Sequence, residues 1–225
     1  MGSIRHGRVS LVKLYLSSFR LGRDRGALRD LVGRAGRAGR AALVFNACDV
    51  YGDSRLRNLE QETEDIASLG FECEELDLRS YFANFDGLRN RLDTYDLIWV
   101  VGGNSFVLAR AMTQSRFGQA AFTPLDDGRL VYAGYSAGIC VTAPDLEGIS
   151  LMDEPDALPD GYPEDVQATT LDWVPWRIVP HWRSQHPEAP LAELAVEHLL
   201  HNGLPFRTLR DGQAIVVEGD DSRLV

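Results

Sequence analysis

Short apolar segments alternate along the chain with longer amphipathic ones. The apolar segments have the length of strands and end in small or turn-forming residues; they cover residues 11–17, 41–47, 72–78, 97–101, 130–135, 176–180, 206–209 and 214–218. Between most of them lie amphipathic stretches long enough for helices. This alternation is typical of a parallel sheet covered by helices, so we predict an α/β fold.

The clearest helix is predicted between the second and third of these strands. Its apolar positions recur at steps of three and four, which is the period of a surface helix: Leu56, Leu59, Thr63, Ile66 and Leu69. The acidic residues of this stretch fall largely on the opposite face, which we expect to meet solvent: Glu60, Glu62, Glu64 and Asp65. Residues 28–39 predict a weaker helix, because three glycines interrupt it, and its arginines are interpreted as a solvated face.

One stretch breaks the alternation. Residues 145–171 hold three prolines, several acids and little periodicity, so we predict a long surface loop. Loops of this length in compact domains are usually functional or disordered.

The composition is that of one soluble domain spanning residues 1–225, with 44% hydrophobic and 25% charged residues and no linker or repeat. The net charge of -10 argues against nucleic acid or an anionic membrane as the main partner. We predict no membrane span, since no apolar run approaches the roughly 18 residues required. The N-terminal stretch is predicted to form a strand and not a signal peptide, because Lys13 interrupts it and no cleavage site follows.

The chain has three cysteines, Cys48, Cys73 and Cys140, an odd number at wide spacing and without a CxxC or Cys/His cluster. They predict reduced, mostly buried thiols in a cytoplasmic protein.

The most informative motif is Gly134-Tyr-Ser-Ala-Gly138, a G-x-S-x-G pattern between an apolar strand and a predicted helix. On such a turn the glycines flank a serine whose hydroxyl stands above the sheet, and the N–H of Ala137 points where an oxyanion would form. Ser136 is therefore a candidate nucleophile. The alternative is that Ser136 only caps the helix.

A second loop, Val101-Gly-Gly-Asn-Ser-Phe106, follows another buried strand. Ligands bind at the carboxyl ends of parallel strands, so this loop and Ser136 are expected at the same edge, with the N–H groups of Gly102 and Gly103 near a substrate carbonyl. Asn104 is a candidate substrate contact; the alternative is a helix cap by Asn104 or Ser105. The absence of G-x-G-x-x-G after the first strand disfavours dinucleotide binding.

A serine nucleophile needs a base and an orienting carboxylate. His181 ends the apolar segment 176–180 and is expected at the same sheet edge as the serine, with His186 as the near alternative. The segments 206–209 and 214–218 predict two strands joined by a tight turn that carries Asp211. Asp153, in the long loop, is the competing acid, and both aspartates are also ordinary turn residues.

Taken together and in this order, these motifs and the early Leu14-Tyr-Leu-Ser-Ser-Phe19 resemble the peptidase E family of serine peptidases, which includes aspartyl dipeptidase and is related to cyanophycinase. The resemblance implies a three-layer sandwich with a mostly parallel sheet, like the class I glutamine amidotransferases (flavodoxin-like), with serine in place of their cysteine. It implies Ser136 as nucleophile, His181 as base, Gly103 and Ala137 as oxyanion donors, and Asp211 or Asp153 as the third member; we rank Asp211 first.

One departure concerns specificity. Aspartyl dipeptidase reads the acidic side chain of its substrate with an arginine after the histidine, whereas residues 184–195 contain none. The sequence therefore argues against strict Asp-X specificity. Arg183 is a possible substitute, although a solvent-facing role is expected.

The leading hypothesis is a cytoplasmic serine peptidase for short peptides that needs no metal or organic cofactor and acts as a monomer or homodimer. The alternatives are an esterase or amidase with the same triad, and a non-catalytic module that binds a peptide or small anion.

Overall fold

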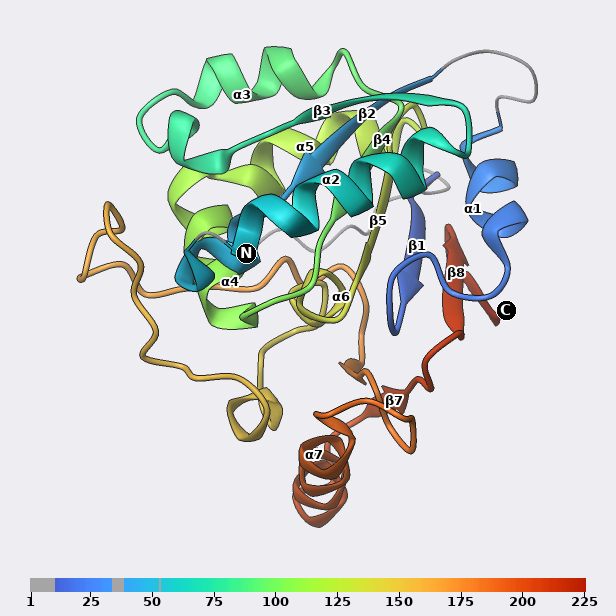
Figure 1. Ribbon diagram of the computed structural model, residues 1–225, viewed down its shortest axis with the longest axis vertical. Coiled ribbons are helices and arrows are strands. Elements are labelled where there is room, and N and C mark those ends of the chain that lie inside the picture. Colours follow the sequence, from blue (N-terminus) through green and yellow to red (C-terminus); the bar gives the residue numbers. More distant parts are fainter. Residues whose placement is uncertain (1–10, 34–38, 53) are drawn as a thin grey trace.

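A seven-stranded sheet forms the centre of the protein, as the computed structural model shows for the residues it describes, 11–33, 39–52 and 54–225 (Figure 1). The strand order is β3-β2-β4-β5-β1-β8-β9. Their bounds are β1 Lys13–Ser17, β2 Gly39–Val44, β3 Phe71–Glu75, β4 Leu97–Val100, β5 Val131–Tyr135, β8 Ala214–Glu218 and β9 Asp221–Leu224. The first five strands in this order run parallel. Strand β8 pairs antiparallel with β1, and β9 pairs antiparallel with β8 at the edge of the sheet. The predicted α/β fold with a mostly parallel sheet is confirmed.

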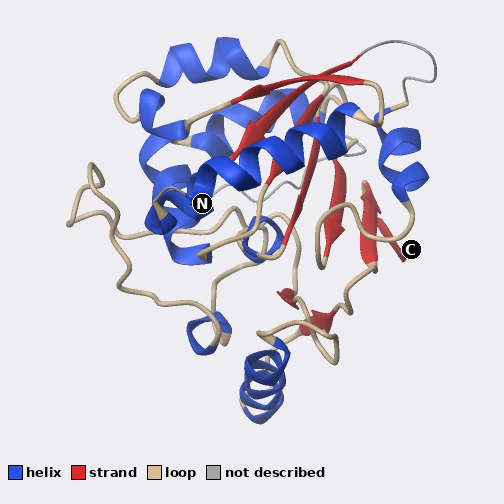
Figure 2. Ribbon diagram, viewed as in Figure 1, coloured by secondary structure: helices blue, strands red, loops and turns tan. Residues whose placement is uncertain are grey.

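Helices cover both faces of the sheet (Figure 2). One face packs against α3 (Phe85–Leu92), α4 (Ser105–Ser115) and α5 (Phe117–Asp126), and the other against α1 (Arg25–Val32) and α2 (Ser54–Ala67). Strand β4 is buried on both sides: Ile98 and Val100 enter the first core, while Leu97 and Trp99 enter the second. A strand covered on both faces is continuously apolar, which explains the pattern seen in the sequence.

Helix α2 is present where the sequence predicts it, but the assignment of Glu62 to the solvent face is wrong. Glu62 is 1% exposed, because it lies one turn before Ile66 on the side that packs against the sheet. There its carboxylate accepts hydrogen bonds from Trp99 Nε1 and the Tyr135 hydroxyl, each at 2.9 Å. Burial is tolerated because both oxygens have donors.

Helix α1 begins and ends at local signals. The Asp24 side chain accepts the N–H of Ala27 at its start, and Gly33 takes a left-handed conformation at its end. The weak helix predicted for residues 28–39 therefore ends at residue 32, and residues 34–38 lie outside the described part of the chain.

Two strands that the sequence placed with the main sheet form a small sheet of their own. Strand β6 (Arg177–Val179) pairs in parallel with β7 (Phe206–Thr208), and α7 (Ala189–His201) connects them. The predicted hairpin of β7 and β8 is therefore wrong, as is the placement of residues 176–180 in the main sheet. A tight turn does follow β7, with Gln213 N–H donating to the carbonyl of Arg210, but the strands on its two sides belong to different sheets. An apolar segment of three residues does not specify its partner strand.

The remaining elements are short. They are the 3-10 turns η1 (Asn46–Tyr51), η2 (Leu78–Tyr81) and η3 (Ile149–Leu151), and the single turn α6 (Ala137–Cys140). Residues 145–171 contain only η3 and otherwise form the predicted irregular loop, which lies along α4 through contacts such as Arg110 Nη1 with the carbonyl of Val166. Strand β9 was not predicted, because its four residues are all exposed and carry no apolar pattern.

The predicted thiols are confirmed as free, with Cys48 and Cys140 buried and Cys73 partly buried. Among the helices of the described residues, none is both long enough and apolar enough to cross a membrane.

Candidate active site

Ser136 stands on a strained turn between β5 and α6. Its backbone has φ 49° and ψ -116°, which L-residues rarely adopt. The flanking glycines are required for space: a Cβ at Gly134 would lie 2.6 Å, and one at Gly138 2.4 Å, from the carbonyl oxygen of Val100 on β4. The Ser136 side chain makes no capping hydrogen bond to α6, so the helix-cap alternative is wrong. The turn has the geometry of a nucleophile elbow.

The loop after β4 lies directly against this turn. A Cβ at Gly102 would lie 3.0 Å from Cβ of Ser136. Gly103 has φ +146°, and a Cβ there would lie 2.5 Å from the carbonyl oxygen of Ala47. Only glycine allows so close an approach of two backbones. The predicted proximity of the glycine loop and Ser136 is therefore present.

Asn104 has a structural task in this loop. Its Oδ1 accepts the N–H groups of Phe106 and Val107 at the start of α4, and its Nδ2 donates to the carbonyl of Glu154. The helix-cap interpretation weighed for this loop therefore holds for Asn104, whose side chain is 4% exposed and has its amide groups occupied.

His181 joins Ser136 to Asp211. Its Nε2 lies 3.1 Å from Ser136 Oγ, and its Nδ1 lies 2.8 Å from Asp211 Oδ1. The parallel pairing of β6 with β7 explains this juxtaposition, because His181 follows the end of β6, Asp211 follows the end of β7, and the two strands end side by side. His186, the alternative base, stacks on His181 at 3.7 Å between ring centroids instead of contacting the serine.

Ser18 bridges two members of the array formed by Ser136, His181 and Asp211. Its hydroxyl accepts the backbone N–H of His181 at 2.8 Å and donates to Asp211 Oδ1 at 2.9 Å. Ser184 Oγ accepts the Asp211 N–H at 2.7 Å. The sequence carried only a weak signal for Ser18, a polar residue after the first strand, and none for Ser184, whose role depends on a contact across 27 residues.

Burial lowers the pKa of the His181 imidazole, and the neighbouring His186 lowers it further, while the hydrogen bond to Asp211 opposes both effects. A lowered pKa keeps the imidazole neutral near pH 7, with Nε2 able to accept a proton. With Nδ1–H held by Asp211, the free lone pair points toward Ser136.

The other predicted residues lie elsewhere. The Asp153 carboxylate accepts the backbone N–H of Ser105 at 2.8 Å, burial raises its pKa, and it makes no contact with His181. Arg183 is exposed, stacks on Trp182 at 4.3 Å and pairs with Glu193. The expected solvent-facing role of Arg183 agrees with these contacts.

A cavity of about 300 Å³ adjoins the array. It is lined by Val50, Tyr51, Asn104, Met152, Asp153, Glu154, Ala157 and Glu188. Glu188 connects the cavity to the array, since its Oε2 lies 3.8 Å from His181 Nε2. No arginine or lysine of the described residues pairs with Asp153, Glu154 or Glu188. Burial, together with the charges of Asp153 and Asp211, raises the pKa of Glu188 to about 7. No sequence motif had pointed to Glu188.

A strained serine turn over a parallel sheet, with a histidine and an aspartate in hydrogen-bond contact, is the arrangement of a serine hydrolase. The comparisons with known proteins agree with that class. The model of Peptidase family S51 matches residues 28–225, so the chain belongs to this family.

Curated relatives share 28–34% identity with the chain. Peptidase E of Streptomyces coelicolor is 34% identical over 64% of this chain and 58% of its own, and a probable alpha-aspartyl dipeptidase of Drosophila melanogaster is 28% identical over 66% of this chain and 63% of its own. The matches thus span about six-tenths of these relatives. The crystal structure of a putative peptidase E protein from Listeria monocytogenes has the same fold, with a TM-score of 0.74 at 20% identity over 95% of this chain and 98% of that one.

Proposed function

We propose that the protein is a cytoplasmic serine peptidase that cleaves short peptides through an acyl-enzyme, without a metal or organic cofactor. The observation that carries this proposal is the continuous contact from Ser136 Oγ through His181 to Asp211, at 3.1 and 2.8 Å. Membership of Peptidase family S51 supports it. We further infer that the sandwich is of the class I glutamine amidotransferase type, with Ser136 at the position of the cysteine, and that the protein acts as a monomer or homodimer.

The proposed reaction uses these contacts and the oxyanion donors that the family resemblance implies. Ser136 Oγ attacks the scissile carbonyl carbon while its proton passes to His181 Nε2, and the N–H groups of Gly103 and Ala137 stabilise the resulting oxyanion. His181 then donates the proton to the leaving amine as the C–N bond breaks. Water, deprotonated by the same nitrogen, then attacks the acyl carbon; the bond from this carbon to Ser136 Oγ breaks, the proton on His181 returns to Oγ, and the product leaves as a carboxylic acid. Asp211 holds the imidazole in one tautomer and stabilises its charged form.

The test is labelling with a fluorophosphonate probe. We expect the wild-type protein to be labelled and Ser136→Ala to lose labelling without unfolding. Ser80→Ala, which changes an exposed serine outside the site, serves as the matched control and is expected to label normally. Labelling that persists in Ser136→Ala overturns the assignment.

Turnover separates the peptidase from the alternatives. We expect hydrolysis of members of a dipeptide library, at rates that Ser136→Ala abolishes. Turnover of simple esters without turnover of any dipeptide would instead indicate an esterase. Saturable peptide binding without any turnover would indicate a non-catalytic binding module.

A further inference from the structure

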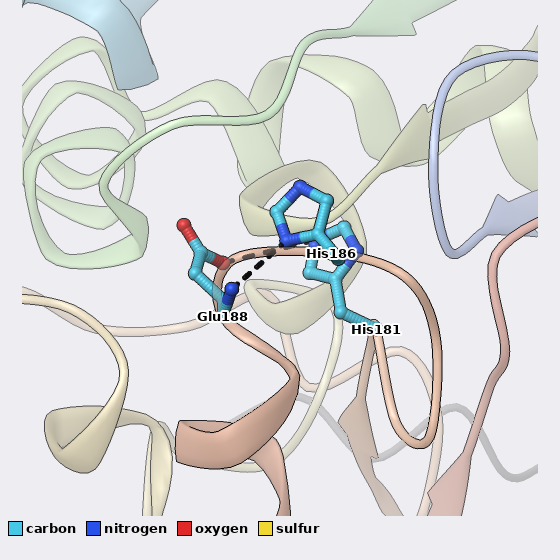
Figure 3. Close-up of side chains that lie close together, drawn as sticks. All are labelled: His181, His186 and Glu188. Atoms are coloured by element: carbon cyan, nitrogen blue, oxygen red, sulfur yellow. Dashed lines mark hydrogen bonds and ion pairs between the residues drawn. The ribbon is translucent and has the colours of Figure 1, made fainter.

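His181, His186 and Glu188 form a cluster whose ligand atoms all lie within 4.8 Å of one another (Figure 3). We propose that this cluster is a binding site for Zn²⁺, and that the bound ion inhibits the protein by occupying His181 Nε2. The binding of the ion stands independently of the proposed function, whereas the inhibition rests on it.

The donor set fits zinc. Two imidazole nitrogens and one carboxylate oxygen form a ligand set that zinc sites use, with a fourth position left for water. Imidazole donors also favour zinc over calcium or magnesium, which prefer oxygen ligands alone. In a tetrahedral site the donor atoms lie about 3.4 Å apart, given metal–ligand distances of about 2.0–2.1 Å. The 3.8 Å between His181 Nε2 and Glu188 Oε2 is already close to that value.

Each histidine has an unprotonated ring nitrogen close to Glu188. The contact of His181 Nδ1 with Asp211 places the proton on Nδ1 and leaves Nε2 unprotonated. His186 Nδ1 accepts the backbone N–H of Glu188 at 3.2 Å, so this nitrogen also carries a lone pair on the Glu188 side. Figure 3 shows the carboxylate of Glu188 beside the stacked rings. Both nitrogens are therefore in the state that binds metal.

The cluster also has a rigid member and two adjustable ones. His181 is buried and held by Asp211, the same carboxylate–histidine support that orients zinc ligands. His186 and Glu188 are only partly buried, and the Glu188 side chain is 38% exposed. Closing the remaining distances therefore requires movement of His186 and Glu188, with loss of the ring stacking between the two histidines and of the hydrogen bond from the Glu188 N–H to His186 Nδ1.

Binding at Nε2 has a direct consequence. The lone pair that the ion takes is the one that contacts Ser136 Oγ at 3.1 Å and would accept its proton. A zinc-loaded protein cannot activate the serine, so substrate turnover and fluorophosphonate labelling stop together. Removal of the ion with a chelator restores both.

The test measures binding of Zn²⁺ by isothermal titration calorimetry to the folded full chain. The variants are Glu188→Gln, which removes the ligand charge, and His186→Phe, which keeps an aromatic ring but removes both nitrogens. His198→Gln is the matched control, because His198 pairs with Glu147 at an exposed position on α7. Circular dichroism checks that each variant folds.

We expect one strong site in the wild type, an affinity about tenfold or more weaker in Glu188→Gln and His186→Phe, and no change in His198→Gln. Cobalt substitution should give the intense visible absorption of four-coordinate Co²⁺ in the wild type and in His198→Gln, but not in Glu188→Gln or His186→Phe. Ser136→Ala should still bind Zn²⁺, which separates this proposal from the peptidase proposal: failure of the catalytic assignment leaves the calorimetry unchanged.

The absence of a single strong site, or an affinity that both ligand variants leave unchanged, overturns the zinc site. Inhibition that persists undiminished in both variants, each compared with its own metal-free rate, overturns the inhibitory mechanism.

Discussion

The hydroxyl of Tyr135 donates a 2.9 Å hydrogen bond to the carboxylate of Glu62 inside the protein, one residue before Ser136. Burial raises the pKa of Glu62, against the opposing effect of its hydrogen bonds from Trp99 and Tyr135. Glu62 therefore links α2 to Tyr135 at the end of β5, directly before the candidate nucleophile Ser136.

This buried acid predicts a pH-dependent stability. Because its pKa is raised on folding, the folded state binds more protons than the unfolded state between the ordinary glutamate pKa and the raised one. The contribution of Glu62 to the free energy of unfolding is therefore present below that window and is lost as the pH rises through it. Glu62→Gln does not titrate and should gain stability relative to the wild type as the pH increases, measured by urea denaturation at several pH values. Glu60→Gln removes an exposed carboxylate from the same helix and is the control. A difference in unfolding free energy between the wild type and Glu62→Gln that stays constant with pH would contradict the prediction.

The glycines of the elbow predict a steric effect on stability. Gly138→Ala places a Cβ about 2.4 Å from the carbonyl oxygen of Val100, so β4 or the elbow must move. Such overpacking costs ~1–3 kcal/mol, which urea denaturation detects. Gly26→Ala, in the first turn of α1, meets only the end of the Asp24 side chain at 3.3 Å and should be neutral or slightly stabilising. Equal losses in both variants would show that the close packing at Val100 is not the cause.

The contacts of the two aspartates predict unequal effects on turnover. Asp211→Asn removes the carboxylate from His181 Nδ1 and favours the wrong tautomer, so kcat for a dipeptide should fall by about 10⁴-fold. Asp153→Asn keeps an oxygen that accepts the Ser105 N–H, so we expect kcat to remain within roughly tenfold of the wild type. Steady-state kinetics on the two folded variants distinguishes the residues. A greater loss in Asp153→Asn would assign the third triad position to that residue.

The acidic lining of the cavity predicts discrimination by substrate charge. Asp153, Glu154 and Glu188 line it, and no arginine or lysine of the described residues pairs with them. At an effective dielectric constant of about 20, like charges ~10 Å apart repel by ~1.7 kcal/mol, more than a factor of ten. We expect kcat/KM for Asn-Leu to exceed that for Asp-Leu by roughly tenfold at low salt and at about pH 8, where most of Glu188 is ionised. The two dipeptides are isosteric, so their kcat/KM ratio reports on charge. This ratio should move toward one in Glu188→Gln, and in the wild type at high salt. Preferred cleavage of Asp-Leu by the wild type would contradict this prediction and favour strict Asp-X specificity.

The sequence by itself determined the local parts of the protein. The apolar period revealed the α/β fold, because each strand of a covered parallel sheet must be apolar on both faces. The motif around Ser136 identified the elbow, since a strained turn pressed against β4 admits glycines alone on its two sides. Both are properties of neighbouring residues, so they are visible along the chain.

Only the tertiary structure decided which distant residues meet. Strand β7 pairs with β6 and not with β8, and this pairing brings Asp211 to His181 across 30 residues. The charge pattern assigned Glu62 to the solvent face of its helix. It is buried because Trp99 and Tyr135 donate hydrogen bonds to its carboxylate. The pairing of a strand and the burial of a polar group depend on residues that are distant in the sequence. The periodicity within one segment does not identify those residues.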